Sequence, residues 1–492
     1  MFVRIQELPE GSDVEADLCI VGAGAAGIAI ARSFIGSQIK VALLESGGFD
    51  LDPETQSLAN GETLGEFYPD LSTVRLRYFG GTTNHWAGQS STFDPIDFEA
   101  RDWVSHSGWP ISYAEYARYL DRAQSVCALT LPPGSSDPWS LDETLPEFPL
   151  PEESFEPEIF RYSEPTIRFG EAYRGDIEAA ENVTCYLYAN LVGLTATEGG
   201  GAVQKAEIAS LDGRRASVKA KIFILAAGGI ENSRLLLLAR LGSGFRNVGR
   251  YFMEHPNYRT ARIVIGRPRQ LPYLVKPRAS YGGEEVRLDF KLSPQEQREQ
   301  GILNHSAYLR AQRSRKQDAG VLVKLWNKVV GKFDDLLGGD EELPVDYELL
   351  LRLEHAPNPE SRVELGDETD ALGLRQPRLV LNFSGLESRT LDAMLDSTAR
   401  GLGASNIGRM QFEASDPDWI ENAGWQFHHC GGTRMHDDPS KGVVDPDCRV
   451  HGVANLYVAG SSVFPTSGHA NPTMNLLALG YRLADRIKEE FT

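Results

Sequence analysis

The chain has 492 residues, of which 41% are hydrophobic and 24% are charged, a balance typical of a folded enzyme and not of a disordered chain. This length indicates two domains, or one large domain with insertions. Lys and Arg total 49 against 69 Asp and Glu, so the formal charge is −20. A surface this acidic repels phosphate backbones and anionic lipid, which argues against nucleic acid as a partner.

The cysteines and the apolar stretches bear on the location of the protein. The five cysteines are scattered without the paired spacing of a metal site, which predicts reduced thiols, no metal and a cytoplasmic protein. The N-terminal residues contain neither a charged leader nor a twin-arginine pair, so we expect no export. The most apolar later stretch, residues 321–337, is interrupted by lysines, and we expect it to pack on the protein's own body and not to cross a membrane.

A dinucleotide-binding turn follows the first apolar strand, Leu18–Val21. The turn consists of Gly22, Ala23, Gly24, Ala25, Ala26 and Gly27, and a helical pattern follows over residues 28–34. The first glycine permits the tight turn, the second lets backbone amides approach a pyrophosphate, and the third lets the helix press on the strand. Glu45 ends the next strand, Val41–Leu44, where an acidic side chain binds ribose hydroxyls. This pattern predicts a dinucleotide but fits NAD as well as FAD.

Two later strands repeat the rhythm of a strand entering a glycine turn. Ile222–Leu225 precedes Ala226, Ala227, Gly228 and Gly229, and residues 456–459 precede Gly460. Three such units predict one parallel sheet, interrupted by long insertions. Residues 132–157 are rich in Pro, Ser, Asp and Glu, as a surface loop would be. Residues 347–354, 362–365 and 378–382 alternate polar and apolar side chains, which predicts antiparallel strands with one wet face in a sheet that covers the substrate.

Two segments carry a family resemblance. Gly80, Gly81, Thr82, Thr83, Asn84, His85 and Trp86 resemble the flavin-contacting segment of the glucose-methanol-choline (GMC) oxidoreductases. The C-terminal part, from His428 through Gly431-Gly432-Thr433 and Gly460 to Asn471-Pro472-Thr473, is similar to the C-terminal signature of that family in its His/Asn form. The motif details are nearest to its pyranose 2-oxidase-like, sugar-oxidising branch.

The resemblance implies an α/β fold with a Rossmann-like FAD-binding domain and a substrate domain built on an antiparallel sheet covered by helices. We assign residues 1–95, 180–260 and 435–492 to the FAD-binding domain, and residues 96–179 and 261–434 to the substrate domain. The residues expected to contact FAD are Gly22, Gly24, Ala25, Ala26, Gly27, Glu45, Gly80, Gly81, Thr82, Asn84, His85, Trp86, Val192, Ala227, Gly228, Gly460, Ser461, Asn471, Pro472 and Thr473. A covalent flavin link through His85 is possible, as is a histidine that only packs over the ring.

The family also implies a catalytic pair. A histidine ahead of the Gly-Thr turn acts on the substrate hydroxyl, and alignment without gaps places His428 there, whereas a shift of one residue would select His429. Asn471 takes the partner position. Neutral imidazole, with an ordinary pKa of about 6.5, suits removal of a hydroxyl proton at neutral pH. Asn471 followed by Pro472 also predicts the start of a terminal helix over residues 473–487.

The function predicted by the resemblance is FAD-dependent oxidation of an alcohol, with hydride transfer to flavin N5, on a sugar or glycoside hydroxyl. Sterol-like or natural-product alcohols are alternatives, as are a redox-neutral lyase with a structural FAD and an NAD-dependent dehydrogenase. The electron acceptor would be dioxygen, a quinone or a redox protein.

Overall fold

The computed structural model describes residues 1–130, 147–265, 271–275, 278–281, 284–311, 346–411 and 418–492. Within these ranges a six-stranded parallel sheet has the order β1 (Phe2–Arg4), β8 (Val183–Leu187), β4 (Val41–Leu44), β3 (Leu18–Val21), β12 (Ile222–Leu225) and β22 (Leu456–Val458). Every residue of β3, β4 and β12 is buried, because strands covered on both faces can be continuously apolar. These strands form where the sequence predicts them.

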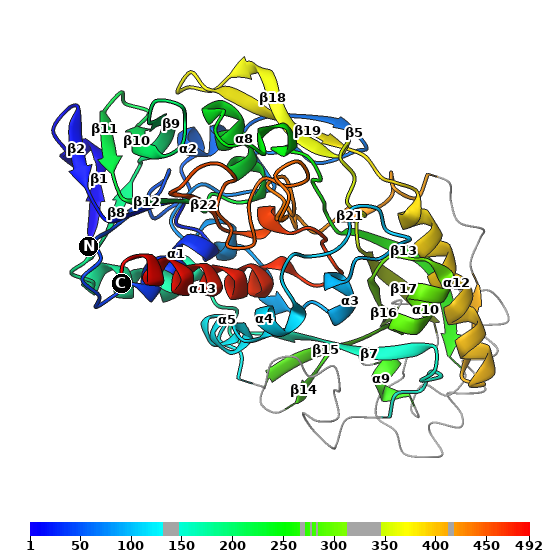
Figure 1. Cartoon of the computed structure of the whole chain (residues 1–492). Helices are drawn as coiled ribbons and strands as arrows, with labels where there is room; N and C mark the ends of the chain where they lie inside the picture. The colour runs from blue at the N-terminus through cyan, green and yellow to red at the C-terminus, as the bar shows by residue number, and fades with distance from the viewer. Residues whose placement is uncertain (131–146, 266–270, 276–277, 282–283, 312–345, 412–417) are drawn as a thin grey trace.

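Helix α1 (Ala25–Ser33) follows β3 and packs against the terminal helix α13 (Pro472–Glu490). In Figure 1 both termini of the chain lie at this end of the molecule. Helix α1 starts at Ala25, three residues before the predicted start, because the helix begins directly at the glycine turn with Gly24 as its N-cap. Asn471 is the N-cap of α13, but its side chain makes no capping hydrogen bond. That side chain is therefore available for other contacts.

The larger sheet has nine strands among the described residues and lies at the other end of the molecule (Figure 1). Its order is β20 (Gly408–Gln411), β13 (Pro256–Ile265), β17 (Asp346–Leu353), β16 (His305–Ala311), β15 (Glu284–Leu292), β7 (Phe155–Tyr162) and β6 (Gln89–Ser90), with β14 (Arg278–Tyr281) beside β15 and β21 (Gly424–Trp425) beside β13. Neighbouring strands are antiparallel, and the helix α12 (Leu386–Ala404) packs on β17 and β20. Strand β6 ties the segment after the Gly80 turn to this sheet.

Smaller elements complete the described fold. A four-stranded sheet contains β2 (Ser12–Glu15), β11 (Arg215–Lys219), β10 (Val203–Ala209) and β9 (Asn190–Ala196). The other helices are α2 (Pro53–Ser57), α3 (Pro95–Phe98), α4 (Tyr113–Ala117), α5 (Leu120–Val126), α6 (Phe169–Ala172), α7 (Arg174–Ala179), α8 (Gly229–Ala239), α9 (Pro272–Val275) and α10 (Pro294–Gln300). The short 3-10 turns are η1 (Ile5–Glu7), η2 (Gly81–Asn84), η4 (Phe245–Asn247) and η6 (Ser461–Val463). No helix in the described ranges combines the length and apolarity needed to cross a membrane.

Two sequence predictions about the strands were wrong in part, and a third differs slightly from the structure. Strands β18 (Arg362–Thr369) and β19 (Arg375–Leu381) do not join the large sheet; they pair with β5 (Glu62–Gly65) and pack on α8. Their apolar residues Val363 and Leu379 are buried with Phe252, and that cluster holds them there. Strand β17 has no wet face in its second half, where both faces are covered.

The third difference is small: the stretch 132–157, predicted to be rich in loops, has no helix or strand over its described residues 147–154 and enters a strand only at its end. Strand β7 begins at Phe155, whose ring packs on Phe290 in the buried face of the large sheet. Residues 131–146 lie outside the described residues, as does the amphipathic stretch 321–337.

A buried ion pair fastens the loop after α3 to the end of β17. Arg101 donates from both terminal nitrogens to Glu354, at 2.8 and 2.6 Å, and neither side chain is exposed. The geometry is bidentate, which is the strong form of this interaction.

We expect Arg101→Met to lower the free energy of unfolding by about 3–5 kcal/mol, because Glu354 would be left buried without its counter-charge. Urea unfolding of the flavin-loaded protein measures the change. Arg298→Met is the matched control: the Arg298–Glu99 pair has 44% of each side chain exposed, and its loss should cost about 1 kcal/mol or less. Equal effects of the two substitutions would contradict this account.

Candidate active site

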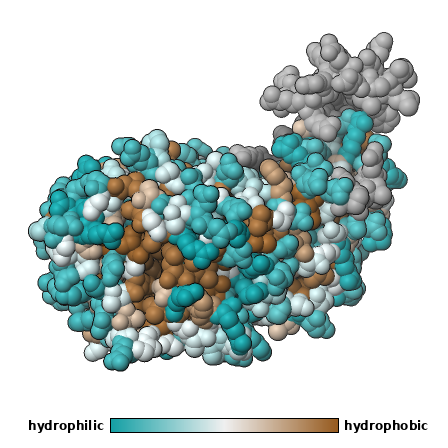
Figure 2. All heavy atoms as spheres, turned by 90° about the horizontal axis from the view of Figure 1, so that it is seen from above, coloured by the Kyte–Doolittle hydropathy of each residue, from teal (hydrophilic) through white to brown (hydrophobic). Residues whose placement is uncertain are grey.

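A cavity of about 570 Å³ lies at the carboxyl edge of the parallel sheet. Gly22, Glu45, Ala226 and Gly460, which lie just beyond the ends of four of its strands, all line the cavity. Ligands of open parallel sheets bind at this edge, where the loops after the strands converge. Figure 2 shows hydrophobic side chains gathered around a hollow in the molecular surface.

The glycine turn has the form that a dinucleotide requires. Gly22 has φ +102°, and a Cβ there would lie 2.6 Å from the carbonyl oxygen of Ala226. At Gly27 a Cβ would lie 1.8 Å from the carbonyl oxygen of Gly22, so α1 can press on the strand only with glycine there. At Gly24, by contrast, a Cβ would meet nothing within 4 Å, because that position faces the cavity. The start of α1 therefore offers its backbone amides and its dipole to a bound anion.

Glu45 is tied to the same turn. Its carboxylate accepts hydrogen bonds from the backbone N–H groups of Ala23, at 3.0 Å, and Gly47, at 2.9 Å. Burial raises the pKa of Glu45, and these backbone donors partly oppose that rise. The side chain lines the cavity in a fixed position.

Most of the predicted cofactor-binding residues line this cavity. They are Gly22, Gly24, Ala25, Ala26, Glu45, Gly81, Thr82, His85, Trp86, Ala227, Gly228, Gly460, Ser461, Asn471, Pro472 and Thr473. The cradle fits a dinucleotide, since residues from the glycine turn, the Gly80 segment and the start of α13 face one space.

Four predicted residues do not line the cavity. Gly27 and Gly80 shape turns: the N–H of Gly80 donates to the carbonyl of Ala23 at 2.8 Å, which joins the two glycine segments. Asn84 donates to the carbonyl of Phe79 at 2.8 Å and accepts from the N–H of Gly170 at 3.0 Å, so it holds its own loop and joins it to α6. Val192 directly follows Asn190 and Leu191 in β9, and those two residues do line the cavity.

Sequence reasoning missed a charged group in the cavity wall. Glu231 forms ion pairs with Arg75, Arg77 and Arg234 at 3.0, 2.8 and 3.0 Å. Arg234 also pairs with Asp370 at 2.6 Å. All five side chains line the cavity. They come from three separate parts of the chain, and of their ion pairs only that of Glu231 with Arg234, three residues apart on α8, has a local spacing.

His428 and Asn471 meet in the cavity wall. His428 Nε2 lies 3.3 Å from Asn471 Nδ2, and the opposite ring nitrogen, Nδ1, lies 2.8 Å from Nδ1 of His255. Arg352 donates to Asn471 Oδ1 at 2.9 Å. A guanidinium has no acceptor, so this bond requires the amide oxygen to face Arg352 and the amide NH₂ to face His428.

The protonation pattern of the two imidazoles follows from that orientation. Because the amide of Asn471 donates to it, His428 Nε2 carries the lone pair, and its Nδ1–H donates to His255. His255 therefore carries its own proton on Nε2, which faces the carbonyl of Ser467 at 3.3 Å. The basic nitrogen of His428 thus lies on the side of Asn471.

His429 is engaged elsewhere. Its Nε2 lies 2.9 Å from the hydroxyl of Tyr68, and its carbonyl accepts from the hydroxyl of Ser461 at 2.6 Å. The hydroxyl of Tyr68 also donates to Glu254 at 2.7 Å. His429 also lines the cavity, but it is His428 that contacts Asn471.

Glu254 holds the backbone of His255 and His428 in place. It accepts from the backbone N–H groups of His255 and His428, at 2.8 and 2.7 Å, in addition to the Tyr68 hydroxyl. Burial raises the pKa of Glu254 to about 7, and these donors limit the rise. The carboxyl group thus fixes the backbone on which both imidazoles stand.

Burial keeps these imidazoles neutral. It lowers the pKa of His428 well below the ordinary value, and the proximity of His255 and Arg352 adds to that effect. Burial likewise lowers the pKa of His255 to about 3, with further contributions from Arg352 and His469. A neutral His428 can accept a proton at neutral pH.

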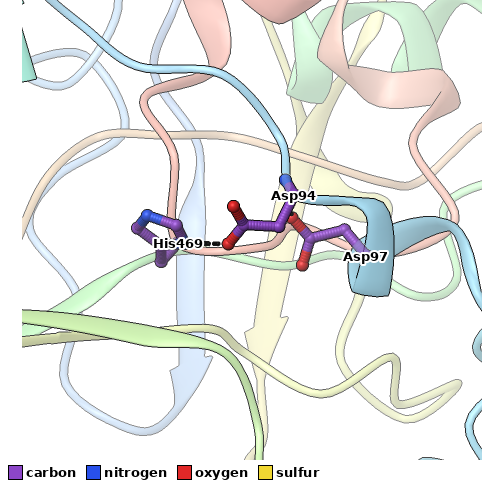
Figure 3. A group of neighbouring side chains, drawn as sticks. All are labelled: Asp94, Asp97 and His469. Carbon is purple, nitrogen blue, oxygen red and sulfur yellow. Dashed lines mark hydrogen bonds and ion pairs between the residues drawn. The ribbon is translucent and has the colours of Figure 1, made fainter. Parts of the chain in front are cut away.

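Asp94, Asp97 and His469 form a cluster in which Asp97 and His469 are buried (Figure 3). His469 is two residues before Asn471 in the chain. His469 lies 3.6 Å from Asp94 and 3.5 Å from Glu158. The ammonium group of Lys291 lies 2.7 Å from both of these carboxylates. Lys291 thus supplies the positive charge that a metal ion would bring, and the cluster anchors the loop that leads to Asn471.

Comparison with known proteins finds a family match in the C-terminal part of the chain. Residues 357–480 match the family model described as GMC oxidoreductase. This part of the chain is similar to the GMC oxidoreductases. The protein is thus an FAD-dependent oxidoreductase that acts on CH–OH groups, which sets aside NAD as the cofactor.

Curated relatives match this chain over nearly its whole length. The fructose dehydrogenase large subunit of Gluconobacter japonicus is 25% identical over 96% of this chain and 98% of that protein. Paromamine 6'-oxidase of Streptomyces fradiae is 24% identical over 96% of this chain and 91% of that protein. Among solved structures, pyridoxine 4-oxidase from Mesorbium loti has a TM-score of 0.58 at 17% identity, with 96% of this chain and 99% of that chain covered. These likenesses agree with the fold described above.

We expect Gly24→Leu to abolish flavin retention without unfolding the chain. The new side chain has open space on the protein, but that space is the cavity that the cofactor needs. The ratio of flavin to protein absorbance after purification measures retention, and circular dichroism checks the fold. Gly175→Leu, at an exposed position of α7 that also has nothing within 4 Å, is the control and should stay yellow. A flavin-loaded Gly24→Leu protein would refute the assignment of the cradle.

Proposed function

We propose that this enzyme oxidises a hydroxyl group of a sugar or glycoside, with His428 as the base and Asn471 as its partner. The observation that carries the proposal is the contact of 3.3 Å between His428 Nε2 and Asn471 Nδ2 in the wall of the cofactor cavity. Neutral imidazole is suited to take the proton of an alcohol as hydride leaves the carbon. When bound, FAD supplies the hydride acceptor at its N5 atom.

His428 and Asn471 have different tasks in this proposal. The lone pair of His428 Nε2 receives the hydroxyl proton of the substrate. The NH₂ group of Asn471 donates to the same oxygen, which orients the substrate and stabilises the negative charge that grows there. Arg352 holds the amide of Asn471 in the orientation that allows this donation.

His255 is a positioning residue. Its Nδ1 accepts the Nδ1–H of His428, which keeps the basic lone pair of His428 on Nε2. Without that acceptor, the proton of His428 would be free to sit on either nitrogen. Glu254 holds the backbone of both histidines through two N–H groups.

The start of α13 contributes the electrostatic field of its helix dipole to the cavity. Asn471 is its N-cap and Pro472 and Thr473 line the cavity, so the positive end of a 19-residue helix points into it. Negative charge near that end is favoured by about 0.3–1 kcal/mol, or more in a buried site.

We infer the following residues as the FAD-binding set: Gly22, Gly24, Ala25, Ala26, Gly27, Glu45, Gly80, Gly81, Thr82, Asn84, His85, Trp86, Val192, Ala227, Gly228, Gly460, Ser461, Asn471, Pro472 and Thr473. Sixteen of these line the cavity, and Gly27, Gly80, Asn84 and Val192 act through turn shape or neighbouring residues. The proposal does not require a covalent bond at His85. The FAD-binding domain comprises residues 1–95, 180–260 and 435–492, and the substrate domain comprises residues 96–179 and 261–434.

The relatives support a sugar-like substrate. Their names specify fructose, paromamine, C-glycosides and pyranose as the compounds on which those proteins act. The acceptor that reoxidises the flavin is dioxygen, a quinone or a redox protein, and reoxidation in air against reoxidation by added quinone separates these cases.

Anaerobic mixing of the holoprotein with a panel of sugars, glycosides and simple alcohols should bleach the flavin with at least one sugar. His428→Ala should slow that bleaching by about 10²–10⁴-fold, because the proton would lose its acceptor. His429→Ala is the matched control, and a smaller loss is expected there because His429 bonds Tyr68. A larger loss in His429→Ala would reverse the assignment, and substrate turnover without any bleaching would indicate a redox-neutral lyase.

The rate of flavin reduction should not decline as the pH falls through the ordinary histidine range near about 6.5. The pKa of His428 is lowered in the folded protein, so its basic form persists to more acidic pH, and the rate falls only below that depressed pKa. Stopped-flow measurement across pH tests this.

His255→Leu should slow flavin reduction less than His428→Ala does, and should shift the acid limb of the profile to higher pH. The shift is expected because the proximity of His255 lowers the pKa of His428. An unchanged acid limb would argue that His255 has only a packing role.

A further inference from the structure

A second, smaller cavity of about 190 Å³ adjoins the cofactor cavity. The two cavities share Ala87, Gln89 and Gln426 as lining residues. The smaller one lies against the large antiparallel sheet, since Asn257, Arg287, Ser306 and Arg352 of β13, β15, β16 and β17 line it. It is thus placed to take a part of the substrate that extends away from the reacting carbon.

The walls of this cavity contain buried polar groups without a partner among the described residues. They are Nε of Arg352, Nε2 of Gln89 and the hydroxyl of Ser306. These residues are 6%, 8% and 1% exposed, respectively. Gln89 accepts from Arg352 through Oε1 at 3.3 Å, which turns its NH₂ group away from the guanidinium. All three groups can donate, and a buried donor without an acceptor costs about 1–3 kcal/mol.

The charge in the cavity wall is also uncompensated. Arg287 forms a bidentate pair with Asp289, at 2.6 and 2.7 Å, so those two charges cancel. Arg352 donates to the neutral amides of Asn471 and Gln89, and no carboxylate of the described residues lies within ion-pair distance of it. Phe160 covers its face at 4.7 Å. A buried charge without a counter-charge is costly, which points to a negative partner from outside the chain.

We propose that this cavity binds a carboxylate of the substrate, and that the enzyme therefore oxidises a hydroxyl of a sugar acid. The inference rests on the proposed function and adds the substrate class. Arg352 contacts both Asn471 and the small cavity, so the carboxylate lies a few carbon atoms from the reacting hydroxyl. The reacting carbon gives its hydride to FAD, and its hydroxyl group gives a proton to His428. The carboxylate takes no part in the reaction and is the same in substrate and product.

Binding is measured first, on the holoprotein with His428→Ala, where oxidation is slow. The probes for calorimetric titration are D-glucuronate, the methyl ester of D-glucuronic acid, D-glucose and D-glucose 6-phosphate. Glucuronate should bind at least about tenfold more tightly than its ester, since a hydrogen bond to a charged group contributes about 1.5–3 kcal/mol. Equal or tighter binding of the ester would overturn the proposal, and tighter binding of the phosphate would overturn the choice of a carboxylate.

Variants then locate the site. Arg352→Gln in the same background should remove the preference for acid over ester. Ser306→Ala should weaken glucuronate binding several-fold without affecting the contact between Arg352 and Asn471. Arg310→Gln is the control: Arg310 is on β16 but is exposed and paired with Glu348 at 2.5 Å. If Arg352→Gln does not retain flavin, Ser306→Ala and the comparison of the four probes still test whether the small cavity binds a carboxylate.

Anaerobic flavin reduction of the unmutated holoprotein separates this inference from the proposed function. Bleaching by neutral sugars without a preference for acids would refute the carboxylate site alone. Binding of glucuronate that depends on Arg352, without bleaching by any alcohol, would refute the proposed oxidation and leave the site intact.

Discussion

The orientation of one amide fixes the proton positions in the proposed catalytic pair. Arg352 can only donate, so the oxygen of Asn471 must face it and the NH₂ group must face His428. The proton positions on His428 and His255 then follow without further assumption, ending at the carbonyl of Ser467. Arg352, a donor-only side chain on the large antiparallel sheet, thereby determines which ring nitrogen of His428 is basic.

Burial makes this chain of hydrogen bonds effective and also constrains the surroundings. Low solvation keeps the imidazoles neutral and raises the pKa of Glu254 to about 7. Most of the buried charges around the site are paired, as in Arg101–Glu354, Arg287–Asp289 and Lys291 with Asp94. Arg352 differs because its hydrogen-bond partners are amides, and the proposed carboxylate site rests on this difference.

Local patterns made a large part of the fold predictable. Strands β3, β4 and β12 are continuous apolar runs beside glycine turns, so their type and limits could be read from neighbouring residues. The turn at Gly22 to Gly27 and the Asn471-Pro472 helix start are also short-range features. Strands β18 and β19 were assigned to the wrong sheet, because alternation reports that a strand has two faces but not which surface will cover them.

The sequence by itself determined the cofactor cradle and the presence of a histidine and an asparagine in a family signature, because these depend on steric rules acting over a few residues. It left His428 and His429 as alternatives. Only the tertiary structure decided which of them faces Asn471, and only it brought Arg352, His255 and Glu254 to the pair, and Arg75, Arg77 and Glu231 to the cavity wall. Apart from His428 and Asn471, which are 43 positions apart, these contacts join residues more than a hundred positions apart, and such pairings depend on how whole sheets pack rather than on local sequence.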